Sequence, residues 1–140
     1  MKPRSSILIS LADEDKADSL PFVRELIQLG YKLFATEGTA AWIQRGGMPV
    51  QLVTKRIGKG SPDVLDVIRD GAVTGVINTP GPADKEVLDG LEIRRAAVER
   101  GIPCVTSIDT ARAMVSAMSQ ASSVFSVRPF AEYRRTGRGY

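Results

Sequence analysis

The sequence predicts an α/β fold: a single doubly wound domain with a five-stranded parallel sheet and helices on both faces. Two observations predict it. Short runs rich in β-branched and aromatic residues alternate along the 140 residues with longer stretches whose apolar residues recur at helical spacing. Most of the helical stretches end at a glycine, as helices commonly do. The chain length suits one domain with one core, which we expect to span residues 1–127.

The first half of the domain contains three predicted strands and two predicted helices. The strands are expected at residues 6–10, 31–35 and 50–53. The first helix ends at Gly30 and contains Pro21, so it begins either near Ser19, with Pro21 in its first turn, or earlier, with a kink. Thr36 is the expected N-cap of the second helix, which runs to about Arg45.

The second half continues the alternation. Strands are expected at residues 73–77 and 103–106, with a further edge strand at 124–127. Ser61 and Pro62 have the chemistry of an N-cap and a first helical residue, for a helix that ends at Gly71. Two more helices are expected, from about residue 85 to 100 and from 109 to 118.

The charge of the chain is concentrated at its C-terminal end. The net charge is +3, but four arginines and only one acid, Glu132, lie in residues 128–140. Residues 1–127 therefore carry equal numbers of acidic and basic side chains. We treat residues 128–140 as an arginine-rich tail, and we expect the domain to have no nucleic-acid partner.

The sequence contains no histidine and one cysteine, Cys104. The missing histidines exclude Ser-His and Cys-His nucleophiles and every zinc site that needs histidine. We predict no catalytic residue, no metal and no cofactor. Cys104 excludes an internal disulfide and is interpreted as a small buried hydrophobe, which fits a cytoplasmic protein. No apolar run is long enough for a membrane span or a signal peptide, so we expect no membrane partner.

Polar residues follow the predicted strands, at the edge where doubly wound sheets bind ligands. Thr36, Gly38 and Thr39 join a strand to a helix, so two hydroxyls and the free amides of a helix N-terminus can hold a phosphate. The alternative is a plain N-cap. Lys16 and Lys55 follow two other strands; they either clamp that phosphate or are solvated loop lysines.

Two further strand ends carry polar groups. Ser10 closes the first strand, and Asn78 and Thr79 follow the fourth. The Asn78 amide both donates and accepts hydrogen bonds, which suits a ribose or a base better than a phosphate. Trp42, by contrast, is interpreted as a core residue rather than a surface on which a ligand stacks.

Other charged residues have structural interpretations. Asp15 and Asp63 are expected to cap or stabilise helix N-termini. Arg94 and Arg95 are expected on a solvated or interface face of their helix.

The strand-end segments together resemble the methylglyoxal-synthase-like domain. The segments that carry the resemblance are Ile9-Ser10, Asp15-Lys16, Ala35-Thr36-Glu37-Gly38-Thr39-Ala40, Leu52-Val53-Thr54-Lys55, Val76-Ile77-Asn78-Thr79 and Ile93-Arg94-Arg95-Ala96-Ala97. The resemblance covers about residues 6–120. The Ile-Arg-Arg helix and the context of Lys55 are most similar to the C-terminal allosteric domain of the carbamoyl phosphate synthetase large subunit.

The resemblance implies a regulatory domain that binds UMP or IMP, and ornithine at its boundary with the catalytic domains. Its implied partners are the catalytic domains of the large subunit and, indirectly, the glutaminase small subunit. The implied reaction of the parent enzyme is the synthesis of carbamoyl phosphate, which pyrimidine and arginine biosynthesis use. The resemblance implies that the phosphate and ribose are contacted by Lys16, Thr36, Gly38, Thr39 and Lys55, with Ser10 beside them. It implies that Asn78, next to Thr79, contacts the base or the ribose, and that Thr106 contacts ornithine.

Several alternatives stay open. Pro80 stands where nucleotide-regulated members have a threonine, and urea-cycle relatives bind N-acetylglutamate, so the effector is not fixed. The alternative within the family is a stand-alone methylglyoxal synthase, a lyase acting on dihydroxyacetone phosphate. It implies histidines, which this chain lacks, and an aspartate where Ser61 stands. A third alternative is nucleic-acid or partner binding through the arginine-rich tail.

Overall fold

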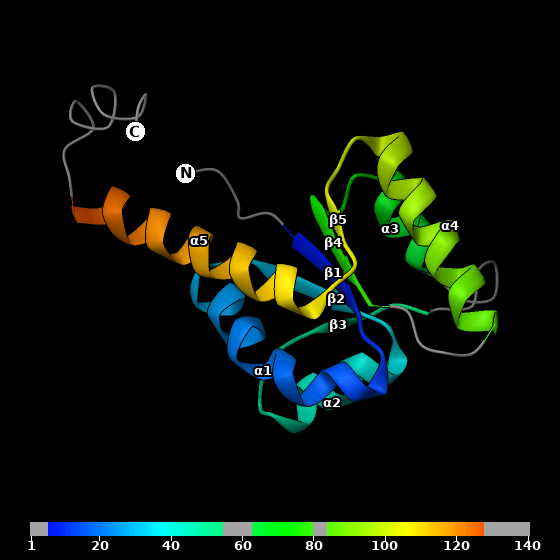
Figure 1. Ribbon diagram of the computed structural model, residues 1–140, viewed down its shortest axis with the longest axis horizontal. Coiled ribbons are helices and arrows are strands. Elements are labelled where there is room, and N and C mark those ends of the chain that lie inside the picture. Colours follow the sequence, from blue (N-terminus) through cyan, green and yellow to red (C-terminus); the bar gives the residue numbers. More distant parts are fainter. Residues whose placement is uncertain (1–5, 55–62, 80–83, 128–140) are drawn as a thin grey trace.

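The structure is a computed structural model that describes residues 6–54, 63–79 and 84–127 (Figure 1). It contains a five-stranded sheet in the order β3-β2-β1-β4-β5, and every strand pair is parallel. The strands are β1 (Ser6–Ser10), β2 (Lys32–Ala35), β3 (Gln51–Leu52), β4 (Gly75–Asn78) and β5 (Cys104–Val105). The predicted parallel α/β fold is confirmed, with shorter edge strands than expected.

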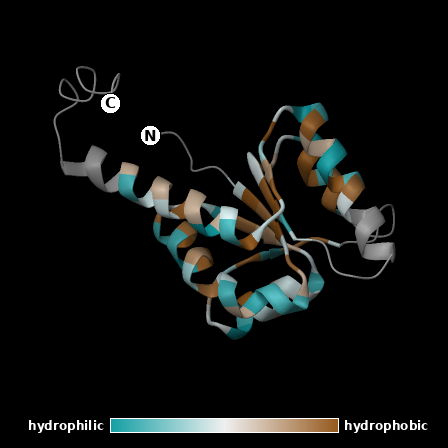
Figure 2. Cartoon of the chain, viewed as in Figure 1, coloured by the Kyte–Doolittle hydropathy of each residue, from teal (hydrophilic) through white to brown (hydrophobic). Residues whose placement is uncertain are grey.

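Helices cover both faces of the sheet, as predicted. They are α1 (Asp13–Gln28), α2 (Glu37–Arg45), α3 (Val64–Arg69), α4 (Asp84–Arg100) and α5 (Ile108–Val127). Helices α1, α2 and α5 lie on one side of the sheet, and α3 and α4 on the other (Figure 1). Each side has its own buried apolar cluster, and the most hydrophobic segments lie between the layers (Figure 2). None of the helices described has both the length and the apolar character needed to cross a bilayer.

Helix α1 begins at the earlier of its two predicted starts. Its first turn contains Asp13, Glu14 and Asp15, whose negative charges stabilise the positive end of the helix dipole. Pro21 lies inside the helix on an exposed position, where it removes one backbone donor without ending the helix. Gly30 follows the helix with a φ of 97°, a left-handed conformation that glycine adopts readily.

The predicted N-cap of α3 is wrong: the helix is capped by Asp63 rather than Ser61. The Asp63 carboxylate accepts a hydrogen bond from the Asp66 amide at 2.8 Å, and the Asp66 carboxylate accepts one from the Asp63 amide at 3.1 Å. Two carboxylates therefore close a capping box, which satisfies two donors of the first turn. The separate expectation that Asp63 serves a helix N-terminus is confirmed.

The edge strand expected at residues 124–127 is also wrong, because these residues belong to α5. Their β-branched and aromatic side chains favour a strand locally. However, residues 119–127 contain neither glycine nor proline, so nothing in the sequence ends the helix before them.

The carboxyl end of β1 lies at the switch point of the sheet. β1 is the central strand, between β2 and β4, and the helices that follow β1 and β4 cover opposite faces. Ser10 is paired with Asn78, and Ile9 with Ala35, which places Thr36 next to Ser10. The fold therefore brings the ends of three strands together where such sheets bind ligands.

Candidate functional site

Five polar side chains are buried together at the carboxyl ends of β1, β2 and β4. Each is 5% exposed or less, although polar residues are mostly found at protein surfaces. We call them the strand-end cluster: Ser10, Thr36, Thr39, Asn78 and Thr79. All five were predicted as site residues from the sequence, and the structure brings them to one edge of the sheet.

Thr36 joins the cluster instead of capping α2. It occupies the N-cap position, as predicted, but its side chain makes no capping hydrogen bond. Its Oγ1 donates to Ser10 Oγ at 3.0 Å, and Asn78 Nδ2 donates to the Ser10 carbonyl at 3.3 Å. The first intrahelical hydrogen bond of α2 runs from the Ala40 amide to the Thr36 carbonyl. The backbone amides that come before Ala40 in the first turn of α2 therefore have no side-chain cap, and they can donate hydrogen bonds to a ligand.

Thr39 and Thr79 hold the turn between β1 and α1 from two sides. The Leu11 amide donates to Thr39 Oγ1 and the Ala12 amide donates to Thr79 Oγ1, both at 2.9 Å. These threonines therefore have a structural role that the sequence did not reveal. Because each hydroxyl oxygen acts as an acceptor here, its own hydrogen can still be donated.

Asn78 has one acceptor without a partner. Its Oδ1 is buried and makes no hydrogen bond within the described part of the chain. A buried polar atom left unsatisfied costs about 1–3 kcal/mol. Buried acceptors of this kind are usually satisfied by an ordered water or by a donor that approaches after a small local movement.

Lys16 reaches from α1 to the first turn of α2. A Cβ atom added at Gly38 would lie only 3.1 Å from Lys16 Nζ, so the ammonium lies directly over this glycine. Lys16 also forms an ion pair with Asp13, whose side chain is 95% exposed. A cation next to the positive end of a helix dipole is unfavourable by itself, and an anion bound between them relieves the repulsion. The arrangement suits a phosphate or carboxylate.

A pocket of about 320 Å³ continues from this point along α2. We call it the Trp42 pocket, and its lining residues are Asp13, Lys16, Ala17, Gly38, Trp42 and Arg45. The interpretation of Trp42 as a core residue is wrong, because its side chain is partly exposed and lines this pocket. The i, i+4, i+7 spacing of Gly38, Trp42 and Arg45 places them on one face of α2, and this spacing is visible in the sequence.

Two predicted features, Lys55 and the arginine-rich tail, lie outside the described residues. A third, Thr106, lies away from the strand-end cluster. Thr106 is exposed and follows β5, two strands away from β1. At about 4.8 Å per strand, Thr106 lies roughly 10 Å from the end of β1 and outside the strand-end cluster.

A metal-binding group and a reactive thiol are two features that we looked for among the described residues. These residues contain no group of three or more acidic, cysteine or histidine side chains that could hold a metal ion. Burial raises the pKa of the Cys104 thiol, and the nearby positive charge of Arg94 only partly opposes this. Cys104 is therefore a poor nucleophile near neutral pH.

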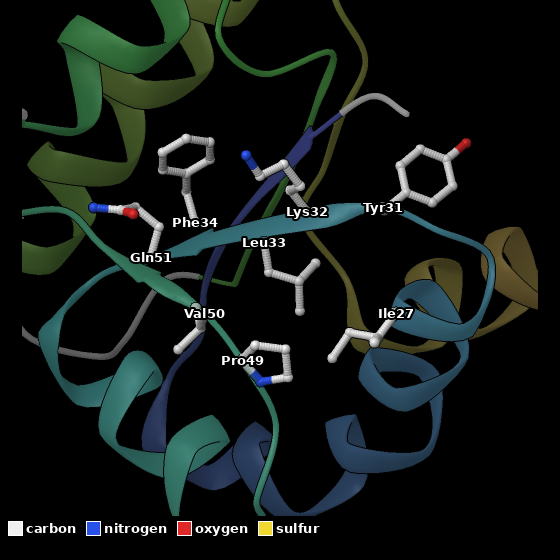
Figure 3. A pocket seen from close by; sticks show the side chains of 8 residues that line it. All are labelled: Ile27, Tyr31, Lys32, Leu33, Phe34, Pro49, Val50 and Gln51. Carbon is white, nitrogen blue, oxygen red and sulfur yellow. The ribbon is translucent and has the colours of Figure 1, made fainter. Parts of the chain in front are cut away.

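A larger pocket of about 420 Å³ lies beside β2 and the segment that leads into β3 (Figure 3). Leu33, Val50 and Ile27 lie on one side of β2, and Phe34 and Lys32 point to the other side (Figure 3). The pocket shares no residue with the strand-end cluster or the Trp42 pocket. Its lining is largely apolar and brings no set of polar groups together, so it is not the candidate site.

Comparison with known proteins supports the resemblance. Residues 18–106 match the family model of the MGS-like domain. The chain is 53% identical over 128 residues to the carbamoyl phosphate synthase large chain of Thermomicrobium roseum, covering 91% of this chain and 12% of that protein. It is 42% identical over 111 residues to the carbamoyl phosphate synthase large chain, C-terminal section, of Methanopyrus kandleri. That match covers 79% of this chain and 20% of the relative, so the chain spans a minor part of both.

Solved structures share the fold. Methylglyoxal synthase from Elizabethkingia anophelis superposes with a TM-score of 0.61 at 19% identity, over 83% of this chain and 80% of that one. ForH superposes with a TM-score of 0.58 at 16% identity, over 86% and 82%. The residues matched by the family model include Thr36, Gly38, Thr39, Asn78 and Thr79. The chain belongs to the MGS-like domain family.

Proposed function

We propose that this chain is the effector-binding domain of a carbamoyl phosphate synthase large chain. In this proposal the strand-end cluster and the first turn of α2 bind the phosphate and ribose of a nucleotide of the UMP or IMP type. The observation that carries the proposal is the Lys16 ammonium, held over the uncapped N-terminus of α2 beside buried hydroxyls. The similarity to carbamoyl phosphate synthase large chains supplies the parent protein.

The contacts divide by chemistry. The phosphate lies over Gly38, where it accepts hydrogen bonds from the first-turn amides of α2 and pairs with Lys16. Lys55, which follows β3 in the sequence, supplies a second cation. A ribose hydroxyl donates to the unpartnered Oδ1 of Asn78 after a small movement of the side chains that cover this buried atom, and thereby removes the cost of the unsatisfied acceptor.

Regulation follows from differential affinity. An effector shifts the parent enzyme between two states only as far as it binds one state more tightly than the other. We propose that the domain in this way controls ATP- and glutamine-dependent carbamoyl phosphate synthesis in the cytoplasm. Its proposed partners are the catalytic domains of the large subunit and, indirectly through them, the glutaminase subunit. Thr106, exposed beyond β5, is the proposed ornithine contact at the boundary with those domains.

Calorimetry of the chain with UMP, IMP, ornithine and N-acetylglutamate tests the proposal. We expect at least one nucleotide to bind, and Lys16→Gln to weaken its binding about 10- to 100-fold, as for the loss of a charge-assisted hydrogen bond. Lys32→Gln is the matched control, because Lys32 is exposed at the amino end of β2, far from Gly38 along the strand. If none of the four compounds bound at millimolar concentration, the proposal would fail.

The likeness to methylglyoxal synthase raises a second candidate function, the elimination of phosphate from dihydroxyacetone phosphate. At 19% identity this likeness concerns the fold alone. The sequence has no histidine, and Ser61 stands where the resemblance implies the catalytic aspartate. We expect no methylglyoxal from dihydroxyacetone phosphate, and its formation by the purified chain would reverse the assignment.

A further inference from the structure

We infer that the outward face of α4 is the surface through which this domain docks on the catalytic part of its parent large chain. We call this surface the α4 face, and its residues are Leu91, Arg94, Arg95 and Val98. The inference rests on the proposed function, because it takes a carbamoyl phosphate synthase large chain as the parent protein. It adds the residues that connect the domain to the rest of that chain.

Two of the three large hydrophobic side chains that are exposed in the described part of the chain lie on α4. Leu91 is 48% exposed and Val98 is 75% exposed. They are seven residues apart, which is about two turns, so they share one face of the helix. Single exposed hydrophobic residues are common on protein surfaces, but their repetition along one face of a helix is typical of a surface that packs on a partner.

The packing of the domain does not use this face. On its opposite side α4 packs on the sheet through Ile93, Ala96 and Ala97, which are 3% exposed or less. These three residues belong to the apolar cluster that also contains Val76 of β4. The helix lies on the outside of this layer of the molecule (Figure 1). Its buried face is therefore complete, and the hydrophobic residues on its other side are left for a partner.

Two arginines accompany the exposed hydrophobic residues. Arg95 is exposed and Arg94 is half-buried, and neither takes part in an ion pair found among the described residues. A guanidinium without a partner inside the domain can form two parallel hydrogen bonds to a carboxylate of another surface. The α4 face therefore fits a partner surface that has an apolar patch bordered by acidic side chains.

A second copy of this chain fits the α4 face poorly. Around a two-fold axis through the middle of the face, the Arg95 side chains of the two copies lie next to each other, and like charges repel. The face is also small. Residues 91–100 extend about 15 Å along a helix about 10 Å wide, whereas a stable interface buries about 800 Å² on each partner. Such an area does not hold two free copies together.

A partner on the same chain needs much less contact area. Two linked domains meet at a high effective concentration, so a small interface can hold them together. This chain spans 12% and 20% of two carbamoyl phosphate synthase relatives, so in those proteins the matched segment is accompanied by a much longer chain. The catalytic part of the parent chain is therefore the occupant of the α4 face.

The position of α4 connects this face to the strand-end cluster. Helix α4 is the next element after β4, and β4 ends at Asn78 in the cluster. The helix also packs directly on this strand, because Ile93 and Val76 belong to the same apolar cluster. An effector that shifts the end of β4 therefore changes how α4 sits on its partner. This gives the two states of the parent enzyme different affinities for the effector, as regulation requires.

Alkylation of an introduced cysteine tests docking without any effector. This chain replaces the matched segment in the large chain of Thermomicrobium roseum, and the isolated chain is the reference. We expect Val98→Cys to react with a maleimide about tenfold or more slowly in the large chain than in the isolated chain, because the partner covers this position. Arg24→Cys, at an exposed position of α1 on the other side of the sheet, is the matched control and should react similarly in both. Mass spectrometry of each peptide distinguishes these thiols from other cysteines.

Charged substitutions supply the second readout. We expect Val98→Asp and Arg95→Glu to reduce the effect of UMP or IMP on carbamoyl phosphate synthesis by this large chain about fivefold or more. In the isolated chain the same variants should bind the nucleotide within about twofold of the unmodified affinity, because both side chains are exposed on the helix and lie outside the strand-end cluster. Arg24→Glu is the matched control and should change neither quantity. Thermal unfolding checks that each variant folds.

The outcomes separate the two proposals. Protection of Val98→Cys without binding of any nucleotide would remove the proposed effector site and keep the docking face. Equal alkylation in the isolated and large chains, with a nucleotide bound by the isolated chain, would overturn the docking face and leave the effector site standing. Unchanged regulation in both charged variants, or an equal loss of nucleotide binding in the isolated chain, would also overturn the docking face.

Discussion

Gly38→Ala should make the protein slightly more stable while it weakens phosphate binding. Gly38 is the second residue of α2 and is absent from the glycines with positive φ, so alanine can adopt its backbone conformation. Alanine is favoured over glycine inside a helix by about 1 kcal/mol. The added Cβ would lie 3.1 Å from Lys16 Nζ, which is closer than an ordinary contact, but a flexible ammonium can move away.

The magnitude follows from these two contributions. Displacing Lys16 disturbs its ion pair with the largely exposed Asp13, which costs at most about 1 kcal/mol. The free energy of unfolding should therefore change by about 0 to +1 kcal/mol, or a rise of roughly 0–4 °C in melting temperature. Binding should fall about 10- to 100-fold, because the methyl group fills the approach to the first-turn amides and shifts the charged partner of the phosphate.

Thermal unfolding and calorimetry with ribose 5-phosphate measure the two effects on the same preparation. The matched control is Ala41→Gly, at an exposed position of the same helix, which should lose about 1 kcal/mol of stability and keep its affinity. Unchanged affinity in Gly38→Ala would refute the placement of the phosphate. A large loss of stability would refute the account of Gly38 as a residue kept for ligand approach.

Three further predictions concern the stability of the fold and the reactivity of Cys104. Thr39→Val should cost about 1–3 kcal/mol in urea unfolding, because the buried Leu11 amide loses its acceptor, whereas Thr39→Ser should cost less. Asp63→Ala should cost about 0.5–2 kcal/mol in the same assay, through loss of the capping box of α3; a neutral result would contradict the cap. Burial raises the pKa of the Cys104 thiol above its ordinary value of 9.0, so the unfolded chain releases the thiol proton at a lower pH than the folded chain, and the free energy of unfolding should fall as pH rises above 9. Arg94→Gln removes the positive charge that partly opposes this shift, so alkylation of the thiol at about pH 8.5 should be slower than in the unmodified chain; faster alkylation would contradict the assignment.

The strand-end cluster was predictable because parallel strands impose a simple rule. Ser10, Thr36 and Asn78 each end or follow an apolar run, and a parallel sheet aligns such ends at one edge. The hydrogen bonds within the cluster were not predictable. Thr36 has a typical N-cap residue type, and only its neighbour across the sheet shows that its hydroxyl turns to Ser10 instead.

Trp42 shows where a pattern in a short helix fails. Helix α2 buries Thr39, Ala40 and Ile43, and a large aromatic residue one position away suggests the same buried face. In the structure that position faces the start of α1, where Lys16 and Ala17 leave a pocket rather than a core. The outcome depends on how two helices pack, which residue spacing within one of them does not determine.

The paired threonine contacts to the β1–α1 turn have a consequence for hydrogen exchange. The amides of Leu11 and Ala12 lie between a strand and a helix, where exchange is normally fast. Their acceptors, however, are 28 and 67 residues away in sequence. These two amides exchange when the threonine hydroxyl turns away or when α2 or the end of β4 separates from β1, so their protection should exceed that of an ordinary turn. Two amides in a connecting turn thus report on the contacts of β1 with α2 and β4, and a ligand that tightens this edge should slow both together.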